Sequence, residues 1–390
     1  MNIIQQSEWK LLEDLCIADA PSGNEGSVRE IIEAACRDFA DEMYTDTLGS
    51  LVVVRRGSKK ESRPDNAGVT AGAAMDAAAG KEESAQAGTA PACAAADAAK
   101  ARAARQSSGA VRLMLAAHMD EIGVIVTYIE ESGLLRFAPV GGVQRISLAG
   151  SRVRFLNGTV GAVFCAHEEP DSDKRKISDY CIDIGADSRQ AAEKCVSIGD
   201  VAAFVGRTER MGNRVLSKAL DNRAGCWVLI QALRQATHTE NDVYAVFTVQ
   251  EELGLRGAQT SAYAIDADVA LAVDVTRTGD VPGAQPMDVR LGGGAAIKVM
   301  DSYSVSHPAL VELLRALAAE AGIAVQTEVL TRGGTDAAAM QRTRGGTVAG
   351  TISIPTRGIH SPCEVADLGD MAACAALTAR LIEADLRQLL

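Results

Sequence analysis

The chain of 390 residues lacks an excess of basic charge, since its formal net charge at pH 7 is −12. Nucleic acids and anionic membranes select basic patches, so we expect no partner of either kind. The sequence also lacks an apolar run long enough to cross a bilayer, and its N-terminal segment has no basic stretch followed by an apolar one. These absences predict a cytoplasmic protein.

The nine cysteines include no CxxC pair, and their number is odd. In a chain of this length such a scatter is typical of reduced, mostly buried cysteines rather than of a disulfide framework or a thiolate zinc site. Cys363 lies in the segment HSPCE, but no base stands beside it to activate its thiol. We therefore expect Cys363 to be a packing residue.

Residues 57–110 have almost no aromatic or β-branched side chains and are rich in Ala, Gly, Ser, Lys and Glu. A segment of this composition offers little apolar surface that could pack on a core. We interpret it as an exposed insertion in a turn between two strands. We expect the insertion to be inert, with a regulatory or docking role as the alternative.

The rest of the chain can form a large core, since 47% of all residues are hydrophobic. Between residues 127 and 214, short β-like runs broken by Gly, Asn and Asp predict a small β-rich module. After residue 215, strands alternate with helices, which predicts an α/β sandwich around a mainly parallel sheet. We therefore expect one large domain, formed by residues 1–126 and 215–390, into which the module 127–214 is inserted.

Acidic and histidine residues recur at the ends of predicted strands and in the loops after them: His118, Asp120, Asp221, Glu251, Glu252, Asp274 and His360. Strand ends of an α/β sheet meet at one edge, so these side chains can converge. Period-two geometry also lets Asp120 orient the imidazole of His118. Taken singly, Asp221 is equally well a helix N-cap, Asp274 a turn residue and the two glutamates a solvated turn. Together the set can hold two divalent metals and a general base.

Six segments of the chain together resemble the M42 family of metallo-aminopeptidases, the group of glutamyl and tetrahedral aminopeptidases. These segments are AAHMDEIG, KALDNRAGC, QEELGLRGAQT, AVDVT, GGTDA and IHSPCEVAD. Their order and spacing are specific, and the likeness covers nearly everything outside residues 57–110. The resemblance implies that His118 and His360 are terminal ligands on different metals and that Asp221 bridges the two metals. It implies that Glu252 and Asp274 complete the two coordination shells. It further implies that Glu251 is the general base and that Asp120 is the partner of His118.

The charge of this set suits a pair of divalent cations. Four positive charges would meet three ionised carboxylates, so one further negative ligand brings the site near neutrality. Paired metals about 3.5–4 Å apart lower the pKa of a shared water and polarise a scissile carbonyl, and Glu251 would pass the proton to the leaving amine. Imidazole and carboxylate ligands suit zinc, cobalt or manganese, and the resemblance favours zinc or cobalt.

We therefore predict an aminopeptidase that removes N-terminal residues from short peptides. The alternatives are a related two-metal hydrolase, such as a carboxypeptidase or N-deacylase, and a catalytically silent assembly protein of the same fold. The resemblance further implies that the β-rich module mediates dimerisation and that dimers form a hollow tetrahedral dodecamer. Arg332 and Arg357 lie near the motifs, where they could either favour an acidic first residue or tie down the backbone.

Overall fold

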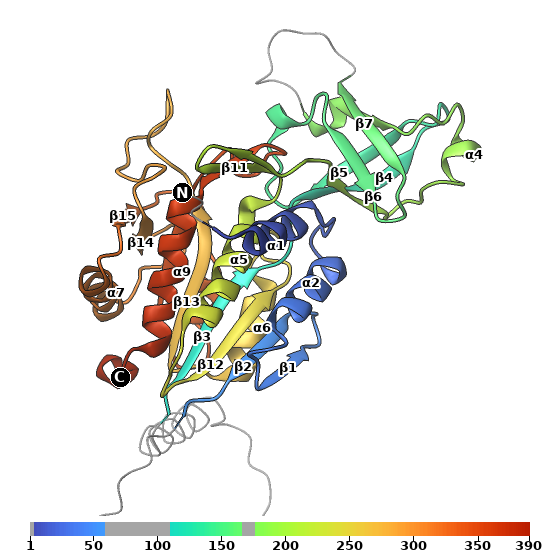
Figure 1. The fold of residues 1–390 in the computed structure, drawn as a ribbon. Coiled ribbons are helices and arrows are strands. Elements are labelled where there is room, and N and C mark those ends of the chain that lie inside the picture. The colour runs from blue at the N-terminus through green and yellow to red at the C-terminus, as the bar shows by residue number, and fades with distance from the viewer. Residues whose placement is uncertain (1–3, 59–109, 166–175) are drawn as a thin grey trace, which may run out of the picture.

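The computed structural model describes residues 4–58, 110–165 and 176–390, which form a large α/β domain and a small β-barrel that projects from it (Figure 1). The large domain is built on one sheet of eleven strands. Along the sheet the strands follow the order β1 (Glu42–Thr45), β2 (Leu51–Arg55), β12 (Asp242–Thr248), β3 (Arg112–His118), β13 (Val269–Thr276), β16 (Val348–Arg357), β17 (Glu364–Asp367), β11 (Arg214–Ser217) and β10 (Glu209–Met211). Two further strands, β14 (Ala295–Met300) and β15 (Val325–Val329), extend from β16.

The centre of this sheet is parallel. Strands β12, β3, β13 and β16 pair in parallel, as the alternation of strands and helices predicted. At the edges, β1 with β2, β16 with β17 and β10 with β11 pair antiparallel. The connections within these pairs are too short for a crossover, so hairpins make the edges antiparallel. The α/β prediction is confirmed, with a parallel core inside a mixed sheet.

Strand β3 shows why the central strands lie between two layers of helices. Leu113, Leu115 and Ala117 belong to one hydrophobic core, whereas Met114 and Ala116 belong to the core on the opposite face. Successive side chains of a strand point to opposite faces, so a continuous apolar run is buried on both sides. The first face is covered by α1 (Gln6–Ile17), α2 (Gly26–Cys36), α5 (Leu220–Gln235), α7 (Pro308–Ala321) and α9 (Leu368–Glu383), and the second by α6 (Arg256–Ile265) and α8 (Ala337–Gln341).

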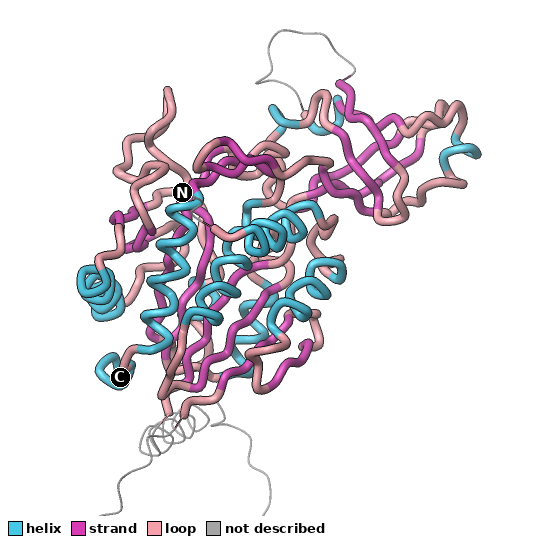
Figure 2. Tube along the Cα trace, viewed as in Figure 1, coloured by secondary structure: helices cyan, strands magenta, loops and turns pink. Residues whose placement is uncertain are grey.

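The projecting unit is a closed barrel with a hydrophobic core of its own. Figure 2 shows its strands packed as a separate body beside the helices of the large domain. Around the barrel the order is β4 (Gly123–Ile129), β5 (Leu135–Val140), β8 (Tyr180–Asp183), β7 (Val160–Cys165), β6 (Arg152–Phe155) and β9 (Val201–Phe204). Because β4 follows β3 closely, the barrel is joined to the large domain next to the C-terminal end of β3.

Most of the predicted insertion, 57–110, lies outside the described residues. Its described ends stand beside the start of β12, where the Gly57 N–H donates to Asp242 and the Asp242 N–H donates to the Val111 carbonyl. This is the end of the sheet opposite the barrel (Figure 1).

The described cysteines are all free, and four of them are buried: Cys16, Cys36, Cys226 and Cys374. Cys363 is exposed, so the prediction that it packs in the interior is wrong. It lies in a loop whose backbone is held by Ser361, and the short motif gave no sign of which face that loop presents. None of the helices in the described part of the chain is both long and apolar enough to cross a membrane.

Candidate metal centre

A cavity of about 1110 Å³ opens at the C-terminal ends of the parallel strands, and Asp221 is one of the residues that line it. Asp221 stands at the start of α5, where a cis peptide bond joins it to Asn222. Its two carboxylate oxygens face different histidines, Oδ1 toward His118 and Oδ2 toward His360. The described residues that can hold a metal ion form two groups, and Asp221 is the member that both groups share.

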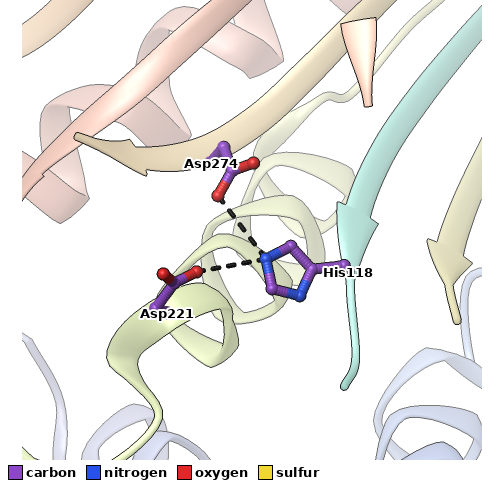
Figure 3. Close-up of side chains that lie close together, drawn as sticks. All are labelled: His118, Asp221 and Asp274. Carbon is purple, nitrogen blue, oxygen red and sulfur yellow. Dashed lines mark hydrogen bonds and ion pairs between the residues drawn. The ribbon is translucent and has the colours of Figure 1, made fainter. Parts of the chain in front are cut away.

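The first group consists of His118, Asp221 and Asp274 (Figure 3). His118 ends β3 and Asp274 lies near the end of β13, so neighbouring parallel strands present both side chains at one edge. The Nε2 of His118 is 3.1 Å from Asp221 Oδ1 and 3.7 Å from Asp274 Oδ1. His118 is only 2% exposed, so this group is buried and positioned by the sheet.

The second group consists of Asp221, Glu252 and His360. The Nε2 of His360 is 3.2 Å from Asp221 Oδ2 and 3.1 Å from Glu252 Oε1. Glu252 follows β12, and His360 lies in the loop between β16 and β17 with a backbone φ of 65°. A non-glycine residue in this left-handed region is strained and stays there only because its surroundings hold it. The side chain of His360 is 27% exposed.

Glu251 stands beside both groups, with its Oε2 3.9 Å from His118 Nε2. Asp120 holds the backbone that carries it: the N–H groups of Glu251 and Glu252 donate to Asp120 at 3.0 and 3.2 Å. The Nδ1 of His118 lies 3.1 Å from the Asp120 carbonyl and 3.4 Å from its Oδ1. Asp120 therefore orients the first histidine and also fixes the turn of both glutamates, a second role that the sequence did not reveal.

The titrating groups show that the site is short of positive charge. Burial lowers the pKa of His118, yet Glu251, Asp120 and Asp221 outweigh burial and raise it well above the ordinary value. Burial also opposes a high pKa at His360, but hydrogen bonds to Asp221 and Glu252 raise it to about 11. The carboxyl of Asp274 has its pKa raised to about 8 by burial and by Asp221, against His118 and Lys298.

Divalent cations fit this arrangement. Two imidazole nitrogens and three carboxylates converge, and the carboxylates raise the pKa of both histidines, so this arrangement favours positive charge in the form of protons or cations. Cations in the two groups would take the place of these protons and leave the histidines neutral, as metal ligands must be. No thiolate takes part, so the donor set suits zinc, cobalt or manganese.

Glu364 is a buried member of the site that sequence analysis did not identify. Its Oε2 accepts from the Asp221 N–H at 2.8 Å, and its Oε1 accepts from the His360 N–H at 2.9 Å. One carboxylate thus holds the backbone of two candidate ligands that lie far apart in the chain. Its position four residues after His360 was the only available signal, because the contact with Asp221 depends on how α5 meets the loop.

The cavity wall carries cations, and one of the two arginines noted above anchors the backbone. Arg357 is bound to Asp280 at 2.7 Å, and Asp280 also accepts from the Leu291 N–H, so Arg357 holds the loop that lines the cavity. Arg332 lines the same cavity and is exposed. The two arginines therefore have different surroundings, although sequence analysis gave both of them the same two possible roles.

Fold and site together define a metal-dependent hydrolase of the α/β class. Comparison with known proteins makes this specific, since residues 99–377 match the model of the family described as M42 glutamyl aminopeptidase. The chain belongs to the M42 family of aminopeptidases and is a peptide hydrolase.

Individual relatives extend over nearly the whole chain. A putative aminopeptidase of Acetivibrio thermocellus is 43% identical over 90% of this chain and 91% of the relative. The lysyl aminopeptidase of Pyrococcus furiosus is 30% identical over 96% and 97%. Among solved structures, aminopeptidase APDkam598 of Desulfurococcus kamchatkensis has a TM-score of 0.80 and 34% identity, with 97% and 94% of the chains covered. The TET1 peptidase of Pyrococcus horikoshii, described as assembling into a tetrahedron or a large octahedral shell, has a TM-score of 0.75 and 28% identity, with 97% and 99% covered.

Proposed function

We propose that this aminopeptidase uses two divalent cations and that Asp221 would bind both of them. Zinc or cobalt is favoured over manganese. His118 and Asp274 would hold one cation, and Glu252 and His360 the other. The observation that carries the proposal is the position of Asp221, whose two oxygens face the two histidines at 3.1 and 3.2 Å. When bound, such a pair supplies an activated water and a polarised substrate carbonyl.

Glu251 is the proposed general base. It stands next to the ligand Glu252 but in neither ligand group, so its carboxylate is available for proton transfer. Burial raises its pKa well above the ordinary value, and bound cations would oppose that rise. Glu251 would take a proton from the attacking water and return it to the leaving amine, while Asp120 holds its backbone in place.

Replacing Glu251 with Gln tests this role. Glu251→Gln should lower kcat on unblocked peptides by about 10²- to 10⁴-fold while both cations stay bound. The matched control is Glu312→Gln, because Glu312 is exposed on α7. Both proteins and the wild type are assayed on a peptide and on its N-acetylated form, with bound metal measured for each. Preference for the acetylated form would favour an N-deacylase, and a metal-loaded wild type inert on all unblocked peptides would defeat the proposal.

The proposed substrates are peptides with an acidic first residue. Apart from the four carboxylates at the metal centre, the described residues that line the cavity include no acid and five cations: Arg277, Lys298, Arg332, Arg342 and Arg357. Lys298 is paired with Glu328 and Arg357 with Asp280, which leaves three arginines without a carboxylate partner among the described residues. An acidic side chain would gain charge-assisted hydrogen bonds there, and a lysine side chain would be repelled.

A panel of aminoacyl substrates that differ in the first residue tests this preference. Glutamyl and aspartyl substrates should have the highest kcat/KM, and Arg332→Ala should reduce that advantage more than it changes the rate on leucyl substrates. Higher kcat/KM on lysyl substrates would contradict the proposed preference, although not the proposed metal centre.

The barrel is the proposed dimerisation domain, and dimers would assemble further into a tetrahedral dodecamer. Supporting this, the barrel and the segment after β5 expose the apolar side chains of Ile146, Val160, Phe164 and Ile198, which contact with a second subunit would bury. Light scattering should give a mass that is a multiple of the dimer; a monomer at micromolar concentration would contradict it. The domain division at about residues 126 and 214 and the cytoplasmic location stay predictions.

A further inference from the structure

A loop of the barrel reaches the metal centre of the large domain. Residues 141–144, here called the barrel loop, connect β5 to the short helix η1 (Arg145–Ser147). The N–H of Gly142 donates to Glu252 Oε2 at 3.2 Å, and the Nε2 of Gln144 donates to the Ile359 carbonyl at 2.8 Å. The loop thus contacts one candidate ligand directly and holds the backbone just before another, His360.

The approach of the barrel loop to His360 leaves no room for a side chain. A Cβ atom on Gly142 would lie 2.4 Å from Nδ1 and 2.6 Å from Cε1 of His360, so the imidazole packs against the bare Cα of the glycine. The neighbouring Gly141 has a φ of +77°, and a Cβ there would lie 2.9 Å from Glu252 Oε2. Both glycines are therefore required by the close contact with the second ligand group.

The barrel loop is fixed to the barrel. Val143 packs against the hydrophobic core of the barrel, and the hydroxyl of Tyr180 on β8 donates to the Arg145 carbonyl at 3.2 Å. The barrel is in turn joined to the large domain by an ion pair of 2.5 Å between Arg154 and Asp19. Any displacement of the barrel would therefore be transmitted to the loop.

These contacts favour one ligand group over the other. Gly142 donates to Glu252, and Gln144 donates to the carbonyl of Ile359, the residue before His360, so both contacts act on the second group. His118 and Asp274 are instead presented by neighbouring strands of the large sheet. The barrel loop is therefore placed to act on one cation site selectively.

We propose that the barrel loop is a positioning element for the second ligand group, so that the placement of the barrel sets the cation affinity of Glu252 and His360. This rests on the proposed two-cation centre. Gly142 and Gln144 act as positioning residues: Gly142 sets the ring of His360 and one oxygen of Glu252, and Gln144 holds the backbone that gives His360 its left-handed conformation. A contact of this type alters metal affinity by about 10- to 100-fold when it is lost.

Two variants test the proposal by cation binding. Gly142→Ala introduces the clash with His360, and Gln144→Glu keeps the shape of the side chain while removing the donor to Ile359. The controls are Gly345→Ala, whose added Cβ meets nothing within 4 Å, and Gln190→Glu, an exposed position on the barrel. Binding of Co²⁺ is followed by titration calorimetry, and the occupancy of each site by anomalous diffraction, with thermal unfolding as a check of the fold.

Each variant should lower the cation affinity of the site at Glu252 and His360 by about 10- to 100-fold. The other site should keep its wild-type affinity, and both control variants should bind cations like the wild type. Equal weakening of both sites, or two sites of wild-type affinity in both variants, would overturn the inference. If Gly142→Ala fails to fold, Gln144→Glu alone tests the inference, because it adds no atom to the contact between Gln144 and Ile359. A wild type that binds fewer than two cations would instead refute the proposed metal centre, so the two failures are distinguishable.

Discussion

The two ligand groups share Asp221 but are built in different ways. The group of His118 lies on the ends of neighbouring parallel strands and is buried, whereas the group of His360 is assembled from loops and is partly exposed. Strand ends are held by the ladder of backbone hydrogen bonds, so the sheet itself positions His118 and Asp274. The second group is held by additional contacts: Glu364 accepts from the His360 N–H, and the barrel loop donates to the carboxylate of Glu252. One rigid and one adjustable ligand group therefore lie side by side.

Asp221→Asn should have the largest effect, because it removes the one ligand that both groups share. We expect the variant to lose tight binding of both cations and to hydrolyse peptides at the background rate. Bound metal after gel filtration and kcat/KM on unblocked peptides measure this. Asp38→Asn, at an exposed position just after α2, is the control for the same chemical change. An Asp221→Asn variant that retained two cations would remove the basis for treating the groups as a pair.

The order in which cations leave should reveal the difference between the groups. A graded chelator titration should remove the cation at Glu252 and His360 first, because that group is more exposed and is held by loops. Correspondingly, His360→Ala should keep one tightly bound cation at His118 and Asp274. Metal content per subunit, followed together with activity, distinguishes this from simultaneous loss. Release of the buried cation first would reverse the comparison.

Glu364→Gln should act mainly on the adjustable ligand group. Glu364 accepts from two backbone N–H groups, and an amide would turn one acceptor into a donor that faces an N–H. We expect cation affinity at His360 to fall by about 10- to 100-fold. Calorimetric titration beside Glu312→Gln gives the comparison. Unchanged affinity with unchanged unfolding temperature would mean that Glu364 has no part in holding the ligands.

Over a single pH unit, the pH dependence of cation binding is the smallest expected effect. In the metal-free protein the pKa of His360 is about 11 and that of His118 is raised, so both are protonated at pH 7. A cation must expel these protons, so apparent affinity rises with increasing pH and falls with decreasing pH, by about tenfold per unit for each proton released. Competition with a chelator between pH 6 and 8 measures the slope. Affinity independent of pH would contradict the assignment of the histidines as ligands.

The fold and the ligand types could be predicted from the sequence because both depend on local patterns. Strand β3 is an apolar run that ends in His118, and the candidate acids of its neighbours lie near or just after their ends, so convergence at one edge follows from the α/β alternation. The contacts that hold the ligands could not be predicted. Gly142 reaches Glu252 across 110 residues through the placement of the barrel on the large domain, and Glu364 reaches Asp221 across 143 through the placement of the start of α5 beside β17. No local pattern encodes such a placement.

Anomalous diffraction from crystals of the cation-loaded wild type tests the central claim most directly. The account predicts two cations per subunit, about 3.5–4 Å apart, one on each side of the Asp221 carboxylate, with His118 and His360 on different ions. A single ion, or two ions that do not share Asp221, would contradict it.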